Sequence, residues 1–434
     1  MHQVPIIVAG LLFSWLSPAV RAQTADSLTL PDAVRLALTS SIALRQAAAQ
    51  VSAAEARVSQ SESEYYPSVR ANAEYMRIGP IPAIDFPGFG SLLLAPADNV
   101  DAHLGLRQTI FDFGRRAAGV EAGRAVVQSA SDAMKTIRSA TSVQAMQTFY
   151  TVMLLHRSIE VQQQQVDALN EHLRITQRRV ESGSSTEFDA LSTTVRVAQS
   201  NNMMLDLRKA LLDQELNLRR LLGLGWDSPL LLSGSLERLE DEPGLDTLLQ
   251  RAATDRPDIV NARDAVESAK RQAQLASLDD SPVLRLSAAY GLRNGYEPNL
   301  NAIRGNWTAG VQLEVPVFNG FRARAHSEET EAVRLAAEER LRDIRRTAEA
   351  EVRKASAALR FAREKIAATL LQVTEAERAV EIAVIRYDSG AGTNLDLLDA
   401  ETSVSSARLQ LLQARYLAVI ARIQLDAAAG FYAQ

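Results

Sequence analysis

The chain has no cysteine and only five histidines among its 434 residues. Without cysteine it can form no disulfide, no thiolate nucleophile, no Cys-ligated zinc or iron–sulfur site, and no lipid-modified N-terminal cysteine. The histidines are scattered without a ligand-like spacing, so we expect no metal site. The formal net charge of -5 provides no basic footprint for nucleic acid, so we expect no partner of that class.

Aromatic residues, proline and glycine are also scarce. Only 5% of the chain is aromatic, and 14 prolines and 21 glycines interrupt a sequence rich in Ala, Leu, Val, Arg, Gln and Glu. Compact cores depend on aromatic side chains, so the composition argues against the roughly three globular domains that the length alone would suggest. It is typical of long helices instead.

Long apolar runs are missing too. A short run from Ile6 to Leu16 leads to a small-residue site, which predicts a signal peptide over residues 1–22 with cleavage at Ala22. That run is too short to span a bilayer, and the longest later uncharged stretch, Ser139 to His156, is rich in Thr, Ser and Gln. Any contact with a membrane must therefore come from strands.

Four short segments alternate apolar and polar residues with a period of two. Two of them follow Pro67 and Pro282, and the clearest runs from Trp307 to Val315. They predict two strand pairs, at 68–111 and 283–318. Such alternation is typical of barrel strands that face lipid on one side and water on the other. A soluble hairpin half-buried on a core is the alternative, but two matched pairs in a helix-rich chain favour the barrel.

Most of the remaining sequence has helical periodicity. The stretches 115–180 and 322–387 contain no proline, and each would form a helix roughly 100 Å long. Their small-residue seams fit packing of the coiled-coil type.

The chain is a tandem duplication. The segment Arg179–Leu191 aligns with Arg386–Leu398, 207 positions later, and the same offset relates Gly223 to Gly430. Pro67 and Pro282 are 215 positions apart, so the loop between the strands is longer in the first copy. The predicted signal peptide, 1–22, is followed by a first repeat, 23–222, which contains a helix, the strand pair 68–111, the long helix 115–180 and a return helix at 187–222. An equatorial linker, 223–244, leads to the second repeat, 245–434. This repeat contains a helix, the strand pair 283–318, the long helix 322–387 and a return helix at 394–429.

The return helices are half as long as the long helices, so a second short helix must complete each return. We expect a helix at 245–278 to complete the first copy. The N-terminal helix, at 31–64, would then complete the second, and the end of the chain would stack beneath its beginning. Four strands cannot close a barrel, and an open edge in lipid leaves backbone groups unsatisfied. Several chains must therefore share one barrel, and three would supply twelve strands.

With these features the sequence resembles the TolC-like outer-membrane efflux family (outer-membrane factors). The resemblance rests on the duplication, on the order of strand pair and long helix, and on a turn motif of the form Arg-Tyr/Val-x-x-Gly-x-x-Thr-x-x-Asp-x-x-x-Ala. The matching residues are Gly183, Thr186, Asp189, Tyr387, Gly390, Thr393, Asp396, Asp399 and Ala400. The implied fold class is mainly α with a small β part: a duplicated long-helix coiled-coil tunnel plus four amphipathic strands per chain that form a shared trimeric 12-stranded β-barrel.

The resemblance implies the channel component of a tripartite efflux or type I secretion system. Such a protein is a passive homotrimeric exit duct in the outer membrane of a Gram-negative-type bacterium. It contacts outer-membrane lipid, extends into the periplasm, and docks a periplasmic adaptor protein and an inner-membrane transporter. No enzymatic activity or cofactor is expected, because the sequence has no nucleophile elbow, metalloprotease motif or phosphate loop. The main alternative is a periplasmic coiled-coil adaptor (membrane-fusion) protein, which should show β-rich domains around a single helical hairpin.

The resemblance also implies roles for individual residues. The adaptor-docking helix tips would carry Gly183, Thr186, Asp189, Gly390 and Thr393, with both glycines at positive φ as their helices end. The periplasmic gate would involve Tyr387, Asp396, Asp399 and Arg415, with the two aspartates forming carboxylate rings in the pore. Capping at the start of a helix is the alternative for Asp396 and Asp189. Gly392 stands where the family has a tip arginine, and Arg174 where it has an acid, so we expect a rewired or looser gate.

Overall fold

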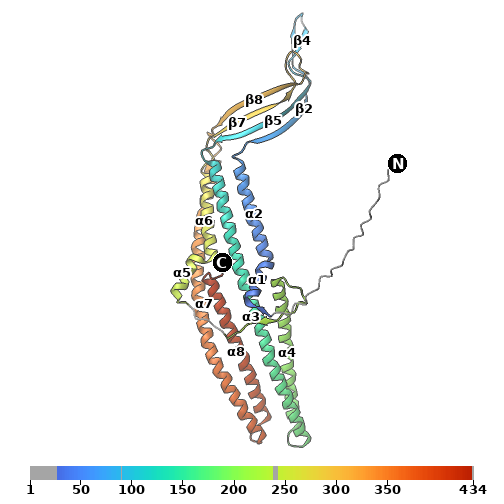
Figure 1. Cartoon of the computed structure of the whole chain (residues 1–434), viewed down its shortest axis with the longest axis vertical. Helices are drawn as coiled ribbons and strands as arrows, with labels where there is room; N and C mark the ends of the chain where they lie inside the picture. The colour runs from blue at the N-terminus through green and yellow to red at the C-terminus, as the bar shows by residue number, and fades with distance from the viewer. Residues whose placement is uncertain (1–26, 89, 238–242, 433–434) are drawn as a thin grey trace, which may run out of the picture.

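A computed structural model describes residues 27–88, 90–237 and 243–432. The predicted signal peptide with Ala22 lies outside the described residues, as does part of the predicted linker. The molecule is elongated, with a β-sheet at one end and two helix turns at the other (Figure 1). Two helices of 67 residues, α3 (Arg115–Glu181) and α7 (Arg322–Asp388), run from the sheet to these turns.

The helices α4 (Glu187–Leu222) and α8 (Asn394–Ala428) return from the turns to about mid-height. Above them, two helix pairs occupy the segments for which the sequence predicted single helices: α1 (Leu30–Ser40) with α2 (Ile42–Ser63), and α5 (Leu245–Asp255) with α6 (Pro257–Ala276). The prediction of unbroken helices was wrong for local reasons. Pro257 disfavours helical geometry at Arg256, which has φ -68° and ψ 123°. Ser41 leaves the helix and caps α2 by accepting a hydrogen bond from the backbone N of Leu44.

Each return helix is completed by the first helix pair of its own repeat, so the predicted exchange between repeats was wrong. Gly223, at the end of α4, lies against Ser40 at the α1–α2 joint, and the Ser40 hydroxyl donates to the Leu221 carbonyl at 2.9 Å. Gly430, beyond α8, lies against Arg256 at the α5–α6 joint. The reason is packing: α1 and α4 both lie on α3, whereas α5 and α8 both lie on α7.

The two largest of the four hydrophobic core clusters in the described residues lie at mid-height and share several equivalent positions. Ala145, Val152 and Leu218 lie in the first cluster, and their equivalents 207 positions later, Val352, Leu359 and Leu425, lie in the second. Beside the first cluster, β1 (Leu28–Thr29) pairs in parallel with β6 (Leu232–Ser233), which joins the linker to the N-terminal segment. The duplication is therefore present in the packing as well as in the sequence.

The sheet at the strand end contains β2 (Ser68–Arg77), β5 (Asp98–Phe111), β7 (Val283–Arg293) and β8 (Arg304–Glu314), in that order and all antiparallel. Pairing of β5 with β7 joins the two predicted strand pairs into one sheet. The loop between β2 and β5 forms a further hairpin, β3 (Ala83–Phe86) with β4 (Gly90–Leu93), beyond the sheet (Figure 1). This hairpin agrees with the longer loop predicted for the first copy.

The predicted fold class is confirmed in its content of long helices and four amphipathic strands. Among the described residues, no helix combines the length and apolarity needed to cross a membrane.

Candidate functional site

The four strands separate polar and apolar residues onto opposite faces of the sheet. Backbone pairing places Asn72, His103, Gly291 and Asn306 in one row across the sheet. A hollow of about 210 Å³ lies against this face, and Arg70, Asn72, His103 and Thr308 are among its lining residues. The polar face is therefore the hollowed one.

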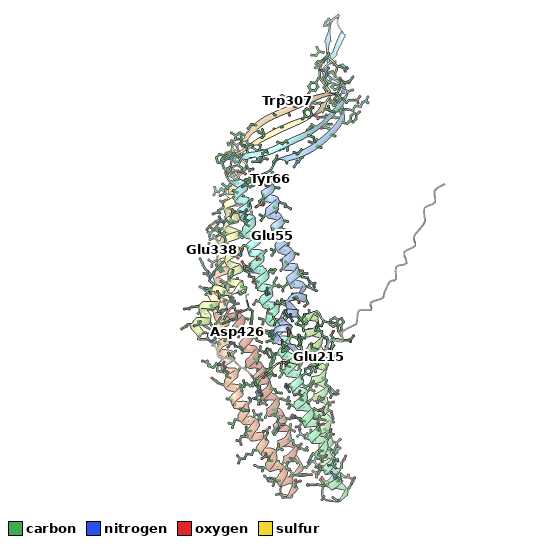
Figure 2. The ribbon with its side chains drawn as sticks, in the orientation of Figure 1. Glu55, Tyr66, Glu215, Trp307, Glu338 and Asp426 are labelled. Carbon is green, nitrogen blue, oxygen red and sulfur yellow. The ribbon has the colours of Figure 1, made fainter. Side chains whose placement is uncertain are left out.

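The opposite face is apolar and exposed. A row formed by Ala71, Leu104, Tyr290 and Trp307 crosses it. Tyr290 and Trp307 are 69% and 74% exposed, and Figure 2 shows Trp307 on β8. A continuous exposed apolar face of this kind is typical of a surface that contacts a membrane or another protein. Both edge strands, β2 and β8, have one side without a strand partner in the described chain.

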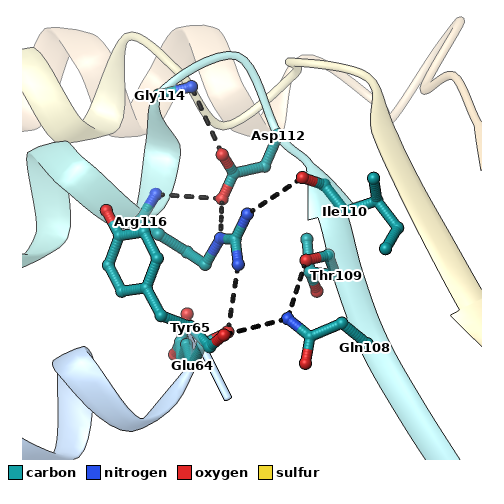
Figure 3. Close-up of polar contacts among 8 residues, drawn as sticks. All are labelled: Glu64, Tyr65, Gln108, Thr109, Ile110, Asp112, Gly114 and Arg116. Atoms are coloured by element: carbon teal, nitrogen blue, oxygen red, sulfur yellow. Dashed lines mark hydrogen bonds and ion pairs between the residues drawn. The ribbon is translucent and has the colours of Figure 1, made fainter. Parts of the chain in front are cut away.

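A buried ion pair fixes the first strand-to-helix junction (Figure 3). Asp112 accepts hydrogen bonds from the backbone N atoms of Gly114 and Arg116, at 3.3 and 3.0 Å, and forms an ion pair with the Arg116 Nε at 2.8 Å. The guanidinium of Arg116 also donates to the carbonyl of Glu64 at 3.1 Å and lies over the ring of Tyr65. These contacts tie the end of α2, the end of β5 and the start of α3 together.

The second junction lacks this ion pair, although its turn also uses positive φ. Asn319 stands at the position equivalent to Asp112, and Ala323 at that of Arg116. Asn319 instead donates to Asp280 at 2.6 Å. The two repeats thus share the backbone turn but not the contacts that hold it.

At the other end of the molecule, each helix turn closes with a capping box. The Thr186 hydroxyl accepts from the backbone N of Asp189, while the backbone N of Thr186 donates to the Asp189 carboxylate; Thr393 and Asp396 repeat this arrangement. The backbone hydrogen bond from Thr393 lowers the pKa of Asp396 below its ordinary value. Both aspartates therefore cap helices, as the alternative interpretation held.

The glycines of both turns have the predicted positive φ. Gly183 has φ 76° and Gly390 has φ 73°, which confirms that expectation. Gly392 is packed closely, because a Cβ there would lie 3.0 Å from the Cβ of Arg386. Arg174 forms an ion pair with Glu171 on its own helix.

The four predicted gate residues do not form one cluster. Tyr387 is almost buried at the end of α7, where its ring contacts the His172 ring and the Arg179 guanidinium, with centroid distances of 5.4 and 4.5 Å. Asp399 forms an ion pair with Arg196 of α4 at 3.0 Å.

Arg415 lies 16 residues beyond Asp399 on α8, about 24 Å along the helix axis. There it forms an ion pair with Glu237 of the linker at 2.6 Å. The structure thus places Arg415 away from the other three predicted gate residues.

A buried polar cluster near the tips was not anticipated from the sequence. The His172 Nε2 lies 2.6 Å from the Oδ1 of Asn394. The Asn394 amide donates to the carbonyl of Asp189 and to the hydroxyls of Ser192 and Thr193. Burial lowers the pKa of His172. The cluster joins α3, α4 and α8, and its only sequence signal is a histidine in line with the apolar positions of α3.

Within the described ranges, no group of three or more His, Asp or Glu side chains is placed to hold a metal ion.

Comparison with known proteins identifies a matching family and several relatives of this chain. The family model described as "Outer membrane efflux protein" matches residues 33–224 and 248–431 separately, one match per repeat. Among curated proteins, the chain is 28% identical to protein CyaE of Bordetella pertussis over 402 residues, which is 91% of this chain and 82% of that protein. It is 26% identical to the alkaline protease secretion protein AprF of Pseudomonas aeruginosa over 330 residues, 74% of this chain and 67% of that protein.

Solved structures share the fold. The crystal structure of CusC superposes with a TM-score of 0.80 at 20% identity, covering 99% of this chain and 98% of that chain. The outer membrane protein VceC from Vibrio cholerae superposes with a TM-score of 0.77 at 22% identity, covering 92% and 96%.

Proposed function

This chain belongs to the outer membrane efflux protein family, and on that premise we propose that three copies form a passive exit duct across the outer membrane. The observation that carries the proposal is the sheet, with its polar hollowed face, its exposed apolar face and its two open edges. Four strands cannot enclose a channel, but twelve strands from three copies can pair edge to edge and leave an open lumen. The polar face would then line water and the apolar face would meet outer-membrane lipid.

Exposed apolar side chains on the helices support the same assembly. Leu191 and Leu205 on α4 and Leu371 and Ile385 on α7 are exposed in the single chain. In a trimer, α4 of one copy and α7 of the next would cover one another and bury these residues. The tunnel wall would then be one helix thick, which explains why the chain has so few aromatic residues.

The helix turns are the proposed docking and gating end. Turns closed by capping boxes at Thr186 and Thr393 are compact enough to present Gly183 and Gly390 to a periplasmic adaptor protein, through which an inner-membrane transporter would connect. In the proposed gate, Asp399 holds α8 to α4 through Arg196, and Tyr387 packs the end of α7. Arg415 would anchor the upper part of α8 to the linker.

The relatives carry names for two kinds of transport. AprF is named for the secretion of an alkaline protease, and CusC for cation efflux. We propose that this chain likewise works as the outer component of a tripartite efflux or type I secretion system, and that it performs no catalysis.

Two neighbouring residues on β8 give a matched test. Val311 lies on the apolar face and is 67% exposed, whereas Gln312 lies on the polar face. An arginine on a lipid face costs about 2–4 kcal/mol at mid-membrane, and a lumen position tolerates one. We expect Val311→Arg to prevent formation of a heat-modifiable trimer in outer-membrane fractions, and Gln312→Arg to leave trimer and bilayer conductance intact. Recovery of the unmutated protein as a soluble periplasmic monomer would refute the proposal and favour the adaptor.

A further inference from the structure

The hollow on the polar face of the sheet is basic. Its lining includes Arg70 on β2 and Arg107 on β5, together with His103, Asn72, Ser287 and Thr308. We infer that this hollow is a binding site for a phosphate group, carried by molecules that pass through the lumen or free in solution. The inference rests on the proposed function in one respect, since it takes this face to be the lumen wall.

The strand register places the two arginines so that both can reach one anion. Arg70 pairs with Gly105, and Ser68 pairs with Arg107. Arg70 and Arg107 are therefore diagonal neighbours on one face of adjacent strands, with backbones about 7–8 Å apart. Two guanidinium groups at this spacing can each donate several hydrogen bonds to a tetrahedral oxyanion between them.

Neither arginine is paired with an acid among the described residues. No ion pair or side-chain hydrogen bond of Arg70 or Arg107 occurs among the residues that the structure describes. Two of the nearby acids have other partners, and Glu74, on the same face of β2, lies four residues from Arg70, about 13 Å along the strand. Asp101 lies 2.8 Å from the His103 Nδ1 and 4.0 Å from the Arg293 Nε, and Glu314 forms an ion pair with Arg285.

A neighbouring copy would not supply the missing charge either. In the proposed barrel, β2 would pair with β8 of the next copy. The only acidic residue of β8 is Glu314, which already binds Arg285. Two like charges facing one hollow repel each other, so an anion from solution or cargo is the group that relieves the repulsion.

The residues beneath the hollow are small, although the backbone conformation does not require a glycine there. Gly105 and Ala289 lie side by side beneath it. A Cβ on Gly105 would meet nothing closer than 3.8 Å, and the residue does not have positive φ. The backbone would therefore accept a larger residue at position 105, and what its side chain would occupy is the hollow itself.

The test uses the full-length protein solubilised from the membrane as its assembled form, with inorganic phosphate as the probe. Isothermal titration calorimetry compares the unmutated protein with Arg70→Gln/Arg107→Gln, which removes the charges, and Gly105→Val, which fills the hollow and keeps them. Arg304→Gln removes a charge from the same face outside the hollow and is the control. We expect saturable phosphate binding that weakens by about tenfold or more in the first two variants and by less than about twofold in the control.

Sources of the phosphate are separated by repeating the titration with glycerol phosphate. Equal binding means that the site accepts the group on a larger molecule, and weaker binding means that it takes free phosphate; both support the site. Absence of saturable binding by the unmutated protein, or equal binding by the double variant, would overturn the inference.

Folding of each variant is checked by its heat-modifiable mobility, and conductance in planar bilayers keeps the two proposals distinct. A protein that conducts but does not bind phosphate refutes the site alone. A protein that binds phosphate but forms no channel refutes the duct alone.

Discussion

Alanine substitutions at Gly223 and Gly183 distinguish two free-energy costs of adding a Cβ to these glycines: backbone strain at positive φ and steric overlap with a neighbouring residue. Both residues have positive φ, 68° and 76°, so a Cβ costs each of them about 1–2 kcal/mol. A Cβ on Gly183 would meet no atom within 4 Å, whereas a Cβ on Gly223 would lie 2.6 Å from the Cβ of Ser40. Overpacking of this kind costs about 1–3 kcal/mol more. We therefore expect Gly183→Ala to destabilise the protein by about 1–2 kcal/mol and Gly223→Ala by about 2–5 kcal/mol.

The assay is unfolding of the solubilised protein in denaturant, followed by far-ultraviolet circular dichroism and combined with a double-mutant cycle. Ser40→Gly removes the atom that opposes a Cβ at position 223, so the two substitutions should couple by about 1–3 kcal/mol. Ser40→Gly should not couple with Gly430→Ala, because the obstacle at Gly430 is the backbone N of Arg256, 3.0 Å from the added Cβ. Equal destabilisation by Gly183→Ala and Gly223→Ala, or a cycle without coupling, would refute the finding that α4 ends against the α1–α2 joint.

Three further predictions concern titration and gating. Burial lowers the pKa of His172, so its contribution to tip stability is present above the unfolded pKa of about 6.5 and lost as the pH falls below it. The hydrogen-exchange protection factors of α3 near the turn, corrected for the intrinsic exchange rate at each pH, should fall at acidic pH, and an equal fall in His172→Gln would contradict this. Burial and the neighbouring carboxylate of Asp132 raise the pKa of Asp264 to about 6, so the stability that this group contributes at low pH is lost as the pH rises through about 6. Asp264→Asn should therefore stabilise the protein at pH 7 by about 1–2 kcal/mol after allowance for partial exposure, with no gain near pH 4; a difference between the denaturation midpoints of variant and unmutated protein that does not change with pH would argue against it. Asp399→Ala breaks the ion pair with Arg196, worth about 0.2–1 kcal/mol per copy, and should raise single-channel conductance, alone or combined with Tyr387→Phe. Tyr387→Phe alone should leave conductance unchanged, because the Tyr387 hydroxyl has no hydrogen-bond partner among the described residues; unchanged conductance in Asp399→Ala would show that Asp399 is not part of the gate.

The long helices, the amphipathic strands and the turns were predictable because each leaves a periodic or repeated signal. The capping boxes follow from Thr186 and Thr393 with an aspartate three residues later, a spacing that local hydrogen bonding requires. The faces of the sheet follow in the same way from alternation, since neighbouring residues on a strand must point to opposite sides.

Contacts between segments distant in the sequence were harder to predict. The joints at Gly223 and Gly430 depend on which long helix each short helix packs against, and the sequence order allows either choice. A usable signal was present, because Ala33 and Leu248 are equivalent core positions of the two repeats, which makes α1 the counterpart of α5. The hydrogen bond between His172 and Asn394 links residues 222 positions apart, and neither residue type indicates that the other is its partner.

The buried Asp112–Arg116 pair has a mechanical consequence for a three-fold assembly. Each copy contributes one strand-to-helix connection that this pair holds rigid and one, at Asn319 and Ala323, that lacks it. Around the circumference of the proposed trimer, connections with the buried ion pair would alternate with connections held by the exposed contacts of Asn319 to Asp280 and His326 to Asp279, three of each. If the helices twisted to widen the far end, the strain would concentrate at the three connections without the buried pair. The strands could then keep their pairing, and the seal against the membrane would persist while the duct changes shape below it.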